Sequence, residues 1–360
     1  AAELAALIGS QTALSNRNII INGAMQVAQR ATSATGVGGD ASYPTLDRFR
    51  QNTSHTAGRF TMSQVAVTDL PGFANALKLD CTTADTSIAS NEIGLIMQRF
   101  EGQDLQQLKK GTSSAEPVTV SFYVKGNASA TYTLELADSD NDRQISQTFS
   151  VTTSWNRVSL TFAGDTSGAL DDDNASSIEL NFWIHAGSNF NGGTLSTTWT
   201  SSTSANRASS SATSFFDSTD RELFITGLQM EIGEQATPFE HRSFGEELAA
   251  CQRYYYQAGY DQNVGVDTTI FAGVAASATL AAQCYRKHPV EMRTPPTMAL
   301  GGSVTAYDGD SNTSVGSIAT NACSNTDGTA NFNTTELGAG RAVMILLNDP
   351  ADFISFDSEL

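Results

Sequence analysis

The sequence predicts an all-β protein, in which a jelly-roll β-sandwich is followed by a linking helix and a second, smaller β-sandwich domain. The first observation is composition: 16% of the 360 residues are charged, well below the roughly 25% of typical globular domains. The second is the 29 glycines and the abundant Ser, Thr and Asn, which suit short strands joined by polar turns. The third is a recurrent alternation of apolar and polar side chains, which is typical of strands half buried against a core.

Four segments are predicted along the chain. Residues 1–16 are expected to form a helical segment or linker, because their apolar run lacks the basic start and the length of a signal peptide. Residues 17–242 form the predicted jelly-roll domain and residues 243–258 the linking helix. Residues 259–360 form the C-terminal β domain.

Alternation identifies five strands in the middle of the jelly-roll domain, separated by Gly, Asn, Asp and Ser residues that supply turns. Every second side chain in these strands is apolar and is expected to face the core, as in an antiparallel sandwich. The inward residues are Val118, Val120, Phe122 and Val124; Tyr132, Leu134 and Leu136; Ile145, Phe149 and Val151; Val158, Leu160 and Phe162; and Ile178, Leu180, Phe182 and Ile184.

The last strand of this domain, residues 222–232, changes phase at Gly227. Leu223 and Ile225 precede this glycine, whereas Leu228 and Met230 follow it. An extra residue in one strand restores the inward face, so we predict a β-bulge at Gly227.

A helix is then predicted, because Ser243 and Glu246 have the spacing of a capping box. The helical pattern continues to about Gly259, where the chain returns to a composition rich in Gly, Ser, Thr and Asn. Strands are expected in the C-terminal domain at residues 269–274, 278–285, 297–300 and 341–347.

The predicted helix carries more apolar surface than one domain can cover. Leu248 and Cys251 recur at helical spacing, and Tyr254, Tyr255 and Tyr256 are consecutive, so that they would cover most of the helix circumference. At least one of them must then face another domain or subunit. We therefore expect these five residues at a domain or subunit interface, in a homo-oligomer whose expected state is a trimer.

Charge and cysteine content exclude several classes of partner. The chain has 38 acidic and 20 basic side chains, for a net charge of −18, which argues against nucleic acid and anionic membranes. No stretch approaches the 18 or more apolar residues of a membrane span, so no membrane insertion is expected. The four cysteines lie far apart without C-x-x-C spacing, which favours reduced, buried thiols over a zinc site.

No common catalytic or phosphate-binding signature occurs in the sequence, and we predict neither catalysis nor a cofactor. Calcium is the one metal considered, because Asp171, Asp172 and Asp173 offer the oxygen ligands that a hard cation prefers. The alternative is a solvated acidic turn.

Sugar binding is predicted from aromatic side chains, which stack on sugar rings, and from amides, which hydrogen-bond to hydroxyls. Trp183 alternates outward if Phe182 points inward, and Trp199 lies in a polar loop. These two are the candidates for glycan binding, with Asn189 and Asn191 as hydrogen-bond partners. The alternative is that Trp183 packs against the low-complexity loop of residues 201–214 and that Trp199 anchors it.

Several blocks of the sequence carry a resemblance to known proteins, and they recur in the same order: residues 18–30, 46–49, 98–105, 225–233, 236–242 and 251–255. Together they resemble a family of bacteriophage virion proteins, usually called tail fibre or minor structural proteins. The resemblance covers about residues 17–256 and implies a jelly roll similar to carbohydrate-binding modules, followed by a smaller β domain. It carries over no binding residues, since ligands of the family are mostly unassigned.

The resemblance implies a phage virion structural protein, a tail fibre or receptor-binding component that contacts host surface glycan without catalysis. It would be assembled in the host cytoplasm and exposed on the particle surface, beside other virion proteins. One alternative is a head fibre or capsid decoration protein. A further alternative is a polysaccharide-degrading tailspike, but that function needs paired carboxylates in a cleft and no such pair is recognisable in the sequence.

Overall fold

The computed structural model describes residues 16–259 and 268–360, which fall into two compact units. The first unit extends to Glu247 and includes Leu360, and the second runs from Leu248 to Glu359. The helical segment expected within residues 1–16 lies outside the described residues, except for residue 16. Among the described residues, we find no helix with the length and hydrophobicity of a membrane span.

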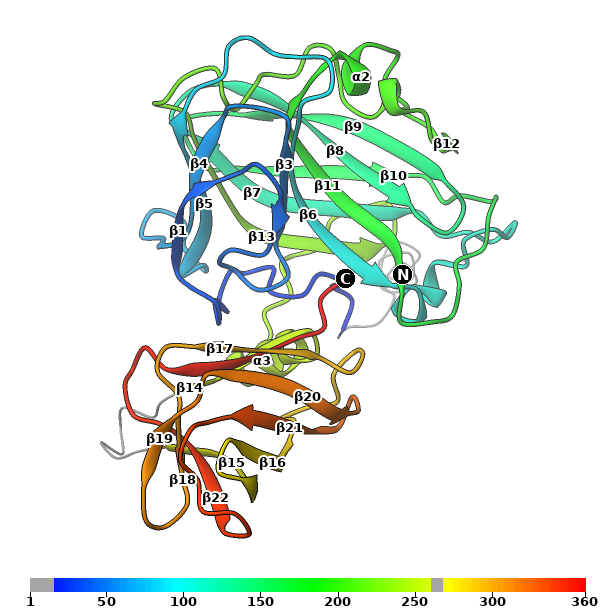
Figure 1. Cartoon of the computed structure of the whole chain (residues 1–360). Helices are drawn as coiled ribbons and strands as arrows, with labels where there is room; N and C mark the ends of the chain where they lie inside the picture. Colours follow the sequence, from blue (N-terminus) through cyan, green and yellow to red (C-terminus); the bar gives the residue numbers. More distant parts are fainter. Residues whose placement is uncertain (1–15, 260–267) are drawn as a thin grey trace. The chain divides into compact units, whose positions relative to one another are not determined.

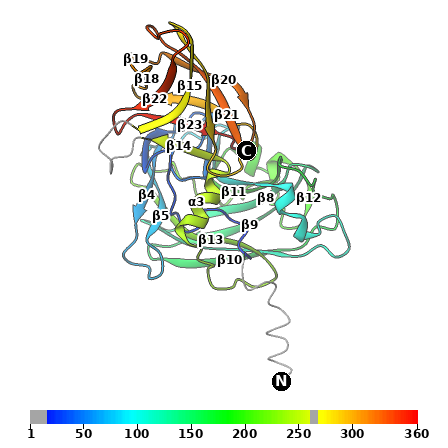
Figure 2. The same ribbon diagram turned by 90° about the horizontal axis from the view of Figure 1, so that it is seen from below.

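The first unit is a jelly-roll β-sandwich of two antiparallel sheets, as predicted (Figure 1, Figure 2). The six-stranded sheet has the order β1 (Ser33–Val37), β4 (Arg59–Ala66), β5 (Asn75–Thr83), β13 (Glu222–Ile232), β7 (Val118–Gly126) and β10 (Asn156–Phe162). The seven-stranded sheet has the order β12 (Thr200–Ser201), β9 (Arg143–Val151), β8 (Ala130–Asp138), β11 (Ser176–Ala186), β6 (Ile93–Glu101), β3 (Arg50–Ser54) and β2 (Ala41–Ser42).

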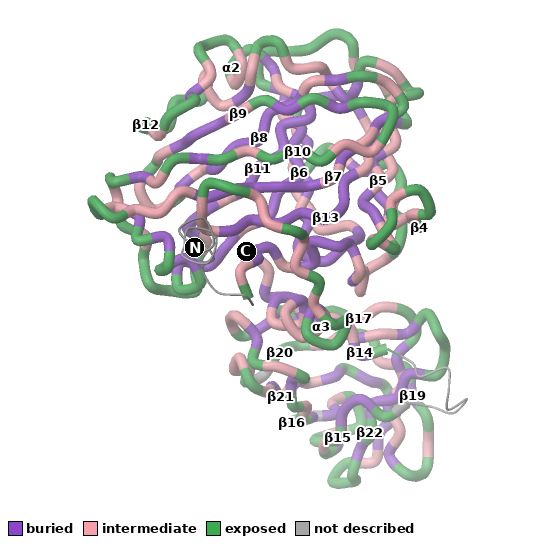
Figure 3. Tube along the Cα trace, turned by 180° about the vertical axis from the view of Figure 1, so that it is seen from behind, coloured by how far each residue is buried: buried purple, intermediate pink, exposed green. Residues whose placement is uncertain are grey.

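The core of the first unit lies between these two sheets and is built from alternate residues of the strands. All five strands predicted from alternation are present, and their inward side chains are buried there, except for Leu160, which packs partly buried against it. Phe122 is in the middle, with edge-on ring contacts to Phe149 at 5.1 Å and to Phe182 at 5.2 Å. Figure 3 shows the buried residues concentrated along β6, β7, β8, β11 and β13.

Short helical turns connect the strands of the first unit. They are the 3-10 helices η1 (Gly102–Asp104), η2 (Gln106–Leu108) and η3 (Ser204–Asn206) and the four-residue helix α2 (Ser188–Asn191).

The β-bulge predicted in β13 is confirmed. The register between β13 and β7 shifts between Thr226 and Gln229, and Gly227 has a φ of +61°, in the left-handed region that favours glycine. Because of this extra residue, both Ile225 before it and Leu228 after it are buried in the same core.

The capping box is also present. The Ser243 amide donates to Glu246 Oε2 at 2.9 Å, and the Glu246 amide donates to Ser243 Oγ at 3.3 Å. These hydrogen bonds hold the pKa of Glu246 below its usual value. The helix α3 that follows spans Phe244–Gln252.

The predicted helix of residues 243–258 is too long, and the boundary between the units falls within α3. The chain turns after Gln252 and enters β14 (Tyr255–Gly259). The tyrosines therefore do not surround a helix, and the premise of the predicted interface is wrong. Tyr256 stacks on Phe356 with 4.3 Å between ring centroids, and both are buried in the core of the second unit. Burial of Tyr256 therefore comes from the pairing of strands, which the helical spacing does not predict.

The second unit is a smaller β-sandwich. One sheet has the order β14, β23 (Phe353–Asp357) and β17 (Thr297–Gly301). The other has the order β19 (Asn312–Ser314), β18 (Thr305–Tyr307), β22 (Ala342–Leu347), β15 (Thr268–Ser277), β16 (Leu280–Lys287), β21 (Asp327–Asn333) and β20 (Ser317–Cys323). The four predicted strands correspond to β15, β16, β17 and β22.

Candidate functional site

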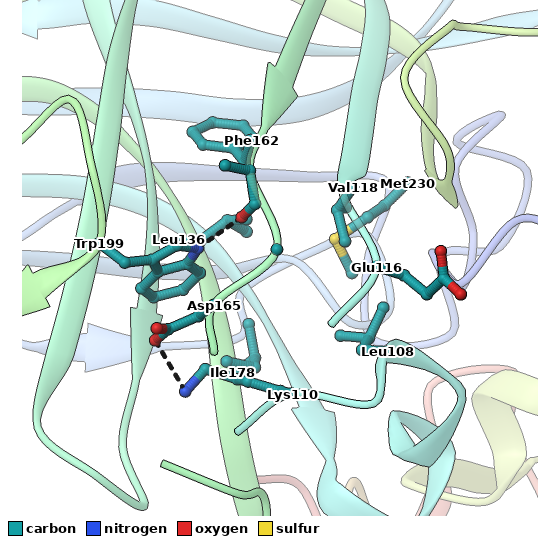
Figure 4. A pocket seen from close by; sticks show the side chains of 12 residues that line it. Leu108, Lys110, Glu116, Val118, Leu136, Phe162, Asp165, Ile178, Trp199 and Met230 are labelled. Atoms are coloured by element: carbon teal, nitrogen blue, oxygen red, sulfur yellow. Dashed lines mark hydrogen bonds and ion pairs between the residues drawn. The ribbon is translucent and has the colours of Figure 1, made fainter. Parts of the chain in front are cut away.

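A cleft opens between the two sheets of the first unit (Figure 4); its cavity volume is about 30 Å³, and about 410 Å³ of empty space is counted when the open solvent at its mouth is included. Strands of both sheets contribute apolar side chains to it, and the loops that precede β7 and follow β10 contribute charged ones. This combination of an apolar lining and a few polar groups is typical of ligand sites. The lining residues are Leu108, Lys110, Glu116, Val118, Leu136, Phe162, Ala163, Gly164, Asp165, Ile178, Trp199 and Met230.

Trp199 forms one wall of this cleft. Its indole N–H donates to the carbonyl oxygen of Ala163 at 2.7 Å, and the ring packs partly buried against the main core. Lys110 Nζ lies 5.3 Å from the ring centroid, within the range of a cation–π contact. The hydrogen bond and the cation fix the orientation of the ring, so this predicted residue contributes both an anchor for its loop and a wall of the cleft.

Four charged side chains form a buried network beside Trp199. Lys110 Nζ pairs with Asp138 and lies 3.1 Å from Asp165 Oδ2, and all three side chains are at least nine-tenths buried. Arg143 donates to both carboxylate oxygens of Asp165, at 2.6 and 2.9 Å. The two cations and two carboxylates compensate one another, which is the condition under which buried charges are tolerated.

The network also fixes the loop after β10. Lys110 Nζ donates to the carbonyl oxygens of Ser167 at 3.0 Å and Gly168 at 2.9 Å. Burial alone would raise the pKa of Asp165, but hydrogen bonds from Arg143 and the Ser167 amide, together with Lys110, outweigh it and lower the pKa. Asp165 is therefore a carboxylate at neutral pH and cannot donate a proton as a general acid.

A second hollow lies beside the cleft and shares Lys110 with it, with about 730 Å³ of empty space that includes open solvent. Its lining is more polar, and near its rim Lys109 pairs with Glu116 at 2.6 Å on the protein surface. An exposed pair of this kind contributes little to stability, so its groups are free to exchange partners. The lining residues are Leu105, Gln106, Lys109, Lys110, Thr112, Ala169 and Leu170.

The prediction that Trp183 stacks on sugar is wrong. Trp183 does point away from the main core, as its alternation implies, but it is only 1% exposed. It packs with Phe190, whose ring centroid is 5.5 Å away, and with Ala208, both from the segment that follows β11. Its N–H donates to Glu135 at 2.8 Å. The alternative interpretation, in which Trp183 packs beneath the polar loop, is the one the structure shows.

A buried salt bridge holds the segment that packs over Trp183. Arg207 donates to both oxygens of Glu135, at 2.8 and 2.9 Å, and Glu135 is fully buried. Asn181 donates to the same carboxylate at 3.1 Å. Leu95 and Met97 of β6 complete a second apolar cluster on this outer face.

The other predicted site residues do not gather at the cleft. Asn189 is exposed in α2, and the Asn191 side chain donates to the Ala186 carbonyl at 3.0 Å. Asp171, Asp172 and Asp173 are exposed in the loop before β11. Within residues 16–259 and 268–360, no group of three or more His, Cys, Asp or Glu side chains has a metal-binding arrangement.

Trp155 is a further aromatic side chain of the first unit, located directly before β10. It is partly exposed, and its N–H donates to Asp69 at 2.9 Å. Lys125 Nζ lies 4.9 Å from its ring centroid. Its position before β10 gives no alternation from which this placement could have been predicted.

One hydrogen-bonded group has the order of a nucleophile, a base and an orienting carboxylate. His185 Nδ1 lies 2.8 Å from Ser214 Oγ, and His185 Nε2 lies 2.8 Å from Glu92 Oε2. However, the His185 side chain is fully buried, and Ser214 Oγ also accepts from the Phe216 amide. The Phe215 amide in turn donates to Ile184 of β11. We therefore assign the group a structural role, which is to attach residues 214–216 to β11.

Comparisons with known proteins give structural likenesses only. No family model matches the chain, and no curated protein matches it. A CBM4 module has a TM-score of 0.31 and 9% identity, covering 59% of this chain and 98% of the module. The module TmCBM61, solved with β-1,4-galactotriose, has a TM-score of 0.31 and 9% identity, over 61% of this chain and 100% of the module. The enzymatically active domain of tailspike protein 4 from bacteriophage CBA120 has a TM-score of 0.31 and 11% identity, over 60% of this chain and 22% of that chain.

These scores are too low to transfer a ligand or an activity to this chain. The fold and the cleft define a two-unit β-sandwich protein with a binding-site candidate at the cleft beside Trp199.

Proposed function

We propose that the first unit binds a surface glycan at the cleft beside Trp199, without catalysis. The observation that carries this proposal is a partly buried indole, held in one orientation on the wall of an apolar cleft, next to a rim of charged and polar groups. Sugars present apolar ring faces together with hydroxyl groups, and a site for them needs both kinds of surface.

The polar contacts would come from the rim. Lys110 and Asp165 are engaged in the buried network, so their role is to hold the loops. Glu116 and Lys109 are partly exposed, and Gln106 lines the adjacent hollow. These groups offer sugar hydroxyls both donors and acceptors at little desolvation cost.

The absence of catalysis is part of the proposal. A glycoside hydrolase of the common kind needs one carboxyl with a raised pKa as the acid and a second carboxylate as its partner. Asp138 and Asp165 both contact Lys110, but the pKa of Asp165 is lowered. Incubation with host polysaccharide should therefore release no reducing sugar, and release would favour the tailspike alternative.

The proposed biological setting is the surface of a phage particle, as a tail fibre or receptor-binding component. Support comes from the sequence blocks that resemble virion proteins, and the alternative is a head fibre or capsid decoration protein. Repeating one module on several copies raises avidity without requiring tight single sites. Imaging of intact particles with a label on this chain would distinguish tail from head.

The test of glycan binding compares two tryptophan variants of the full chain on a glycan array. Trp199→Ala should weaken binding about tenfold or more, the expected effect of losing one aromatic stacking surface. Trp155→Ala is the matched control, because it removes another partly buried, hydrogen-bonded indole away from the cleft. Circular dichroism checks that both variants are folded. Absence of binding by the parent protein, or equal binding by the parent and Trp199→Ala, would contradict the proposal.

A further inference from the structure

The second unit exposes an apolar surface on its larger sheet. Val274 of β15 is 51% exposed, Tyr285 of β16 is 52% exposed and Met344 of β22 is 39% exposed. Among the described residues, the other large exposed hydrophobic side chains are Ile88 and Phe244. Three of these five side chains thus lie on adjacent strands of one sheet. We call this surface the apolar face, formed by Ala272, Val274, Ala276, Tyr285, Ala342 and Met344.

Strand register makes the apolar face continuous. Ala272 is directly opposite Tyr285 on one side and Met344 on the other, and Val274 is opposite Ala342. Side chains directly opposite each other on neighbouring strands are in contact range. The alternate residues Ala275 and Val343 point the other way and are buried in the core of the unit. A contiguous exposed apolar surface of this kind marks an interaction site in soluble proteins.

The charge distribution favours a second copy of this chain as the occupant. The chain carries a net charge of −18, so copies repel each other over most of their surface. The apolar face has no charged side chain. Its borders carry charges of both signs: Arg341 pairs with Asp310 at 2.9 Å, and Lys287 is opposite Asp327 in the strand register. A border of mixed charge suits an identical surface better than a partner of one sign.

The shape of the apolar face also suits an identical face. Ala272 forms a low point between Met344 and Tyr285, and Val274 stands two residues further along the same strand. Face-to-face sheets pack about 10 Å apart with interdigitating side chains. Under a two-fold rotation, Val274 of one copy can fill the low point over Ala272 of the other.

We propose that the apolar face packs against the same face of a second copy, so that the protein associates through its second unit. This site replaces the interface predicted at residues 248–256, where the tyrosines are buried within the structure. The proposal does not depend on glycan binding by the first unit.

The test is the molar mass of the full chain, measured by sedimentation and light scattering over a micromolar concentration series. The parent protein should show twice its 38.1 kDa chain mass, because a face-to-face contact with two-fold symmetry is closed after two copies. Ala272→Glu places a charge in the centre of the contact and should raise the dissociation constant by at least roughly 100-fold. Ala272→Ser adds only one oxygen at the same position and should keep the parent mass.

A control variant outside the second unit makes the test specific. Ile88→Glu adds the same charge at a side chain that is 46% exposed in the first unit, and it should keep the parent mass. Far-ultraviolet circular dichroism checks that each variant is folded. A monomeric parent protein, an unchanged mass for Ala272→Glu, or equal dissociation of Ile88→Glu would overturn the proposal. Cross-links joining Tyr285 only to residues 1–15 or 260–267 of the same chain would also overturn it.

Discussion

Replacement of Gly227 by alanine tests how the bulge in β13 is packed. Gly227 has a φ of +61°, and a left-handed conformation costs an alanine about 1–2 kcal/mol. A Cβ atom at this position would lie 2.7 Å from Phe73 Cζ and 3.0 Å from Tyr123 Cδ2. Moving a ring off its preferred rotamer adds about 0.5–1.5 kcal/mol. Gly227→Ala should therefore destabilise the first unit by roughly 2–3 kcal/mol.

Gly36 provides a matched control for this prediction. It lies in β1 with a φ of +67°, and a Cβ atom there would meet nothing within 4 Å. Gly36→Ala should show only the backbone cost of about 1–2 kcal/mol. The difference between the two variants therefore measures the contact with Phe73 and Tyr123.

Tryptophan fluorescence during urea unfolding is the assay, because all three tryptophans of the chain lie in the first unit. A loss of 2–3 kcal/mol corresponds to a midpoint about 1 M lower in urea. If Gly227→Ala unfolds with the parent protein, the left-handed bulge is wrong. If it unfolds with Gly36→Ala, the ring contact contributes nothing.

Two further predictions concern buried aromatic and titratable side chains. Trp183→Ala should destabilise the first unit by about 3–5 kcal/mol in the same urea assay followed by circular dichroism, because it leaves a cavity and removes a donor to Glu135. A loss below about 1 kcal/mol would show that the segment after β11 is not packed as described. Burial lowers the pKa of His288, so its folded state binds protons less readily than the unfolded chain, and stability of the second unit should fall as pH decreases from about 7.5 to about 5. His288→Gln should flatten this dependence, and an equal slope in both proteins would assign it to other groups.

Alternation in the sequence predicted the strands in which apolar side chains on one face alternate with more polar side chains on the other. Strands β7 to β11 and β13 follow this rule, and even the phase change at Gly227 could be interpreted correctly. By contrast, the strand at residues 93–101 was not predicted. In β6, Leu95 and Met97 are buried on the outer face while Ile96 is buried in the main core, so the polar half of the alternation is missing there.

The candidate site was predictable only in part. The alternation of side chains gives the correct side of the sheet for Trp183, but it says nothing about what covers that side. Trp199, from a polar loop, was predicted as a candidate and does line the cleft. The Lys110, Asp138 and Asp165 network was missed because its members are separated by tens of residues and come together only through the sheet topology.

The segment after β11 has a consequence for which positions tolerate change. With Phe190, Ala208 and Arg207 closing the outer side of β11, this strand is enclosed on two sides, and its outward residues are under the same packing constraint as its inward ones. Surface variation is then left to the loops at the ends of the strands, such as residues 106–116 and 163–174. Under the proposed glycan-binding function, selection for new ligands would place substitutions there, beside the cleft, while the face above β11 stayed nearly constant.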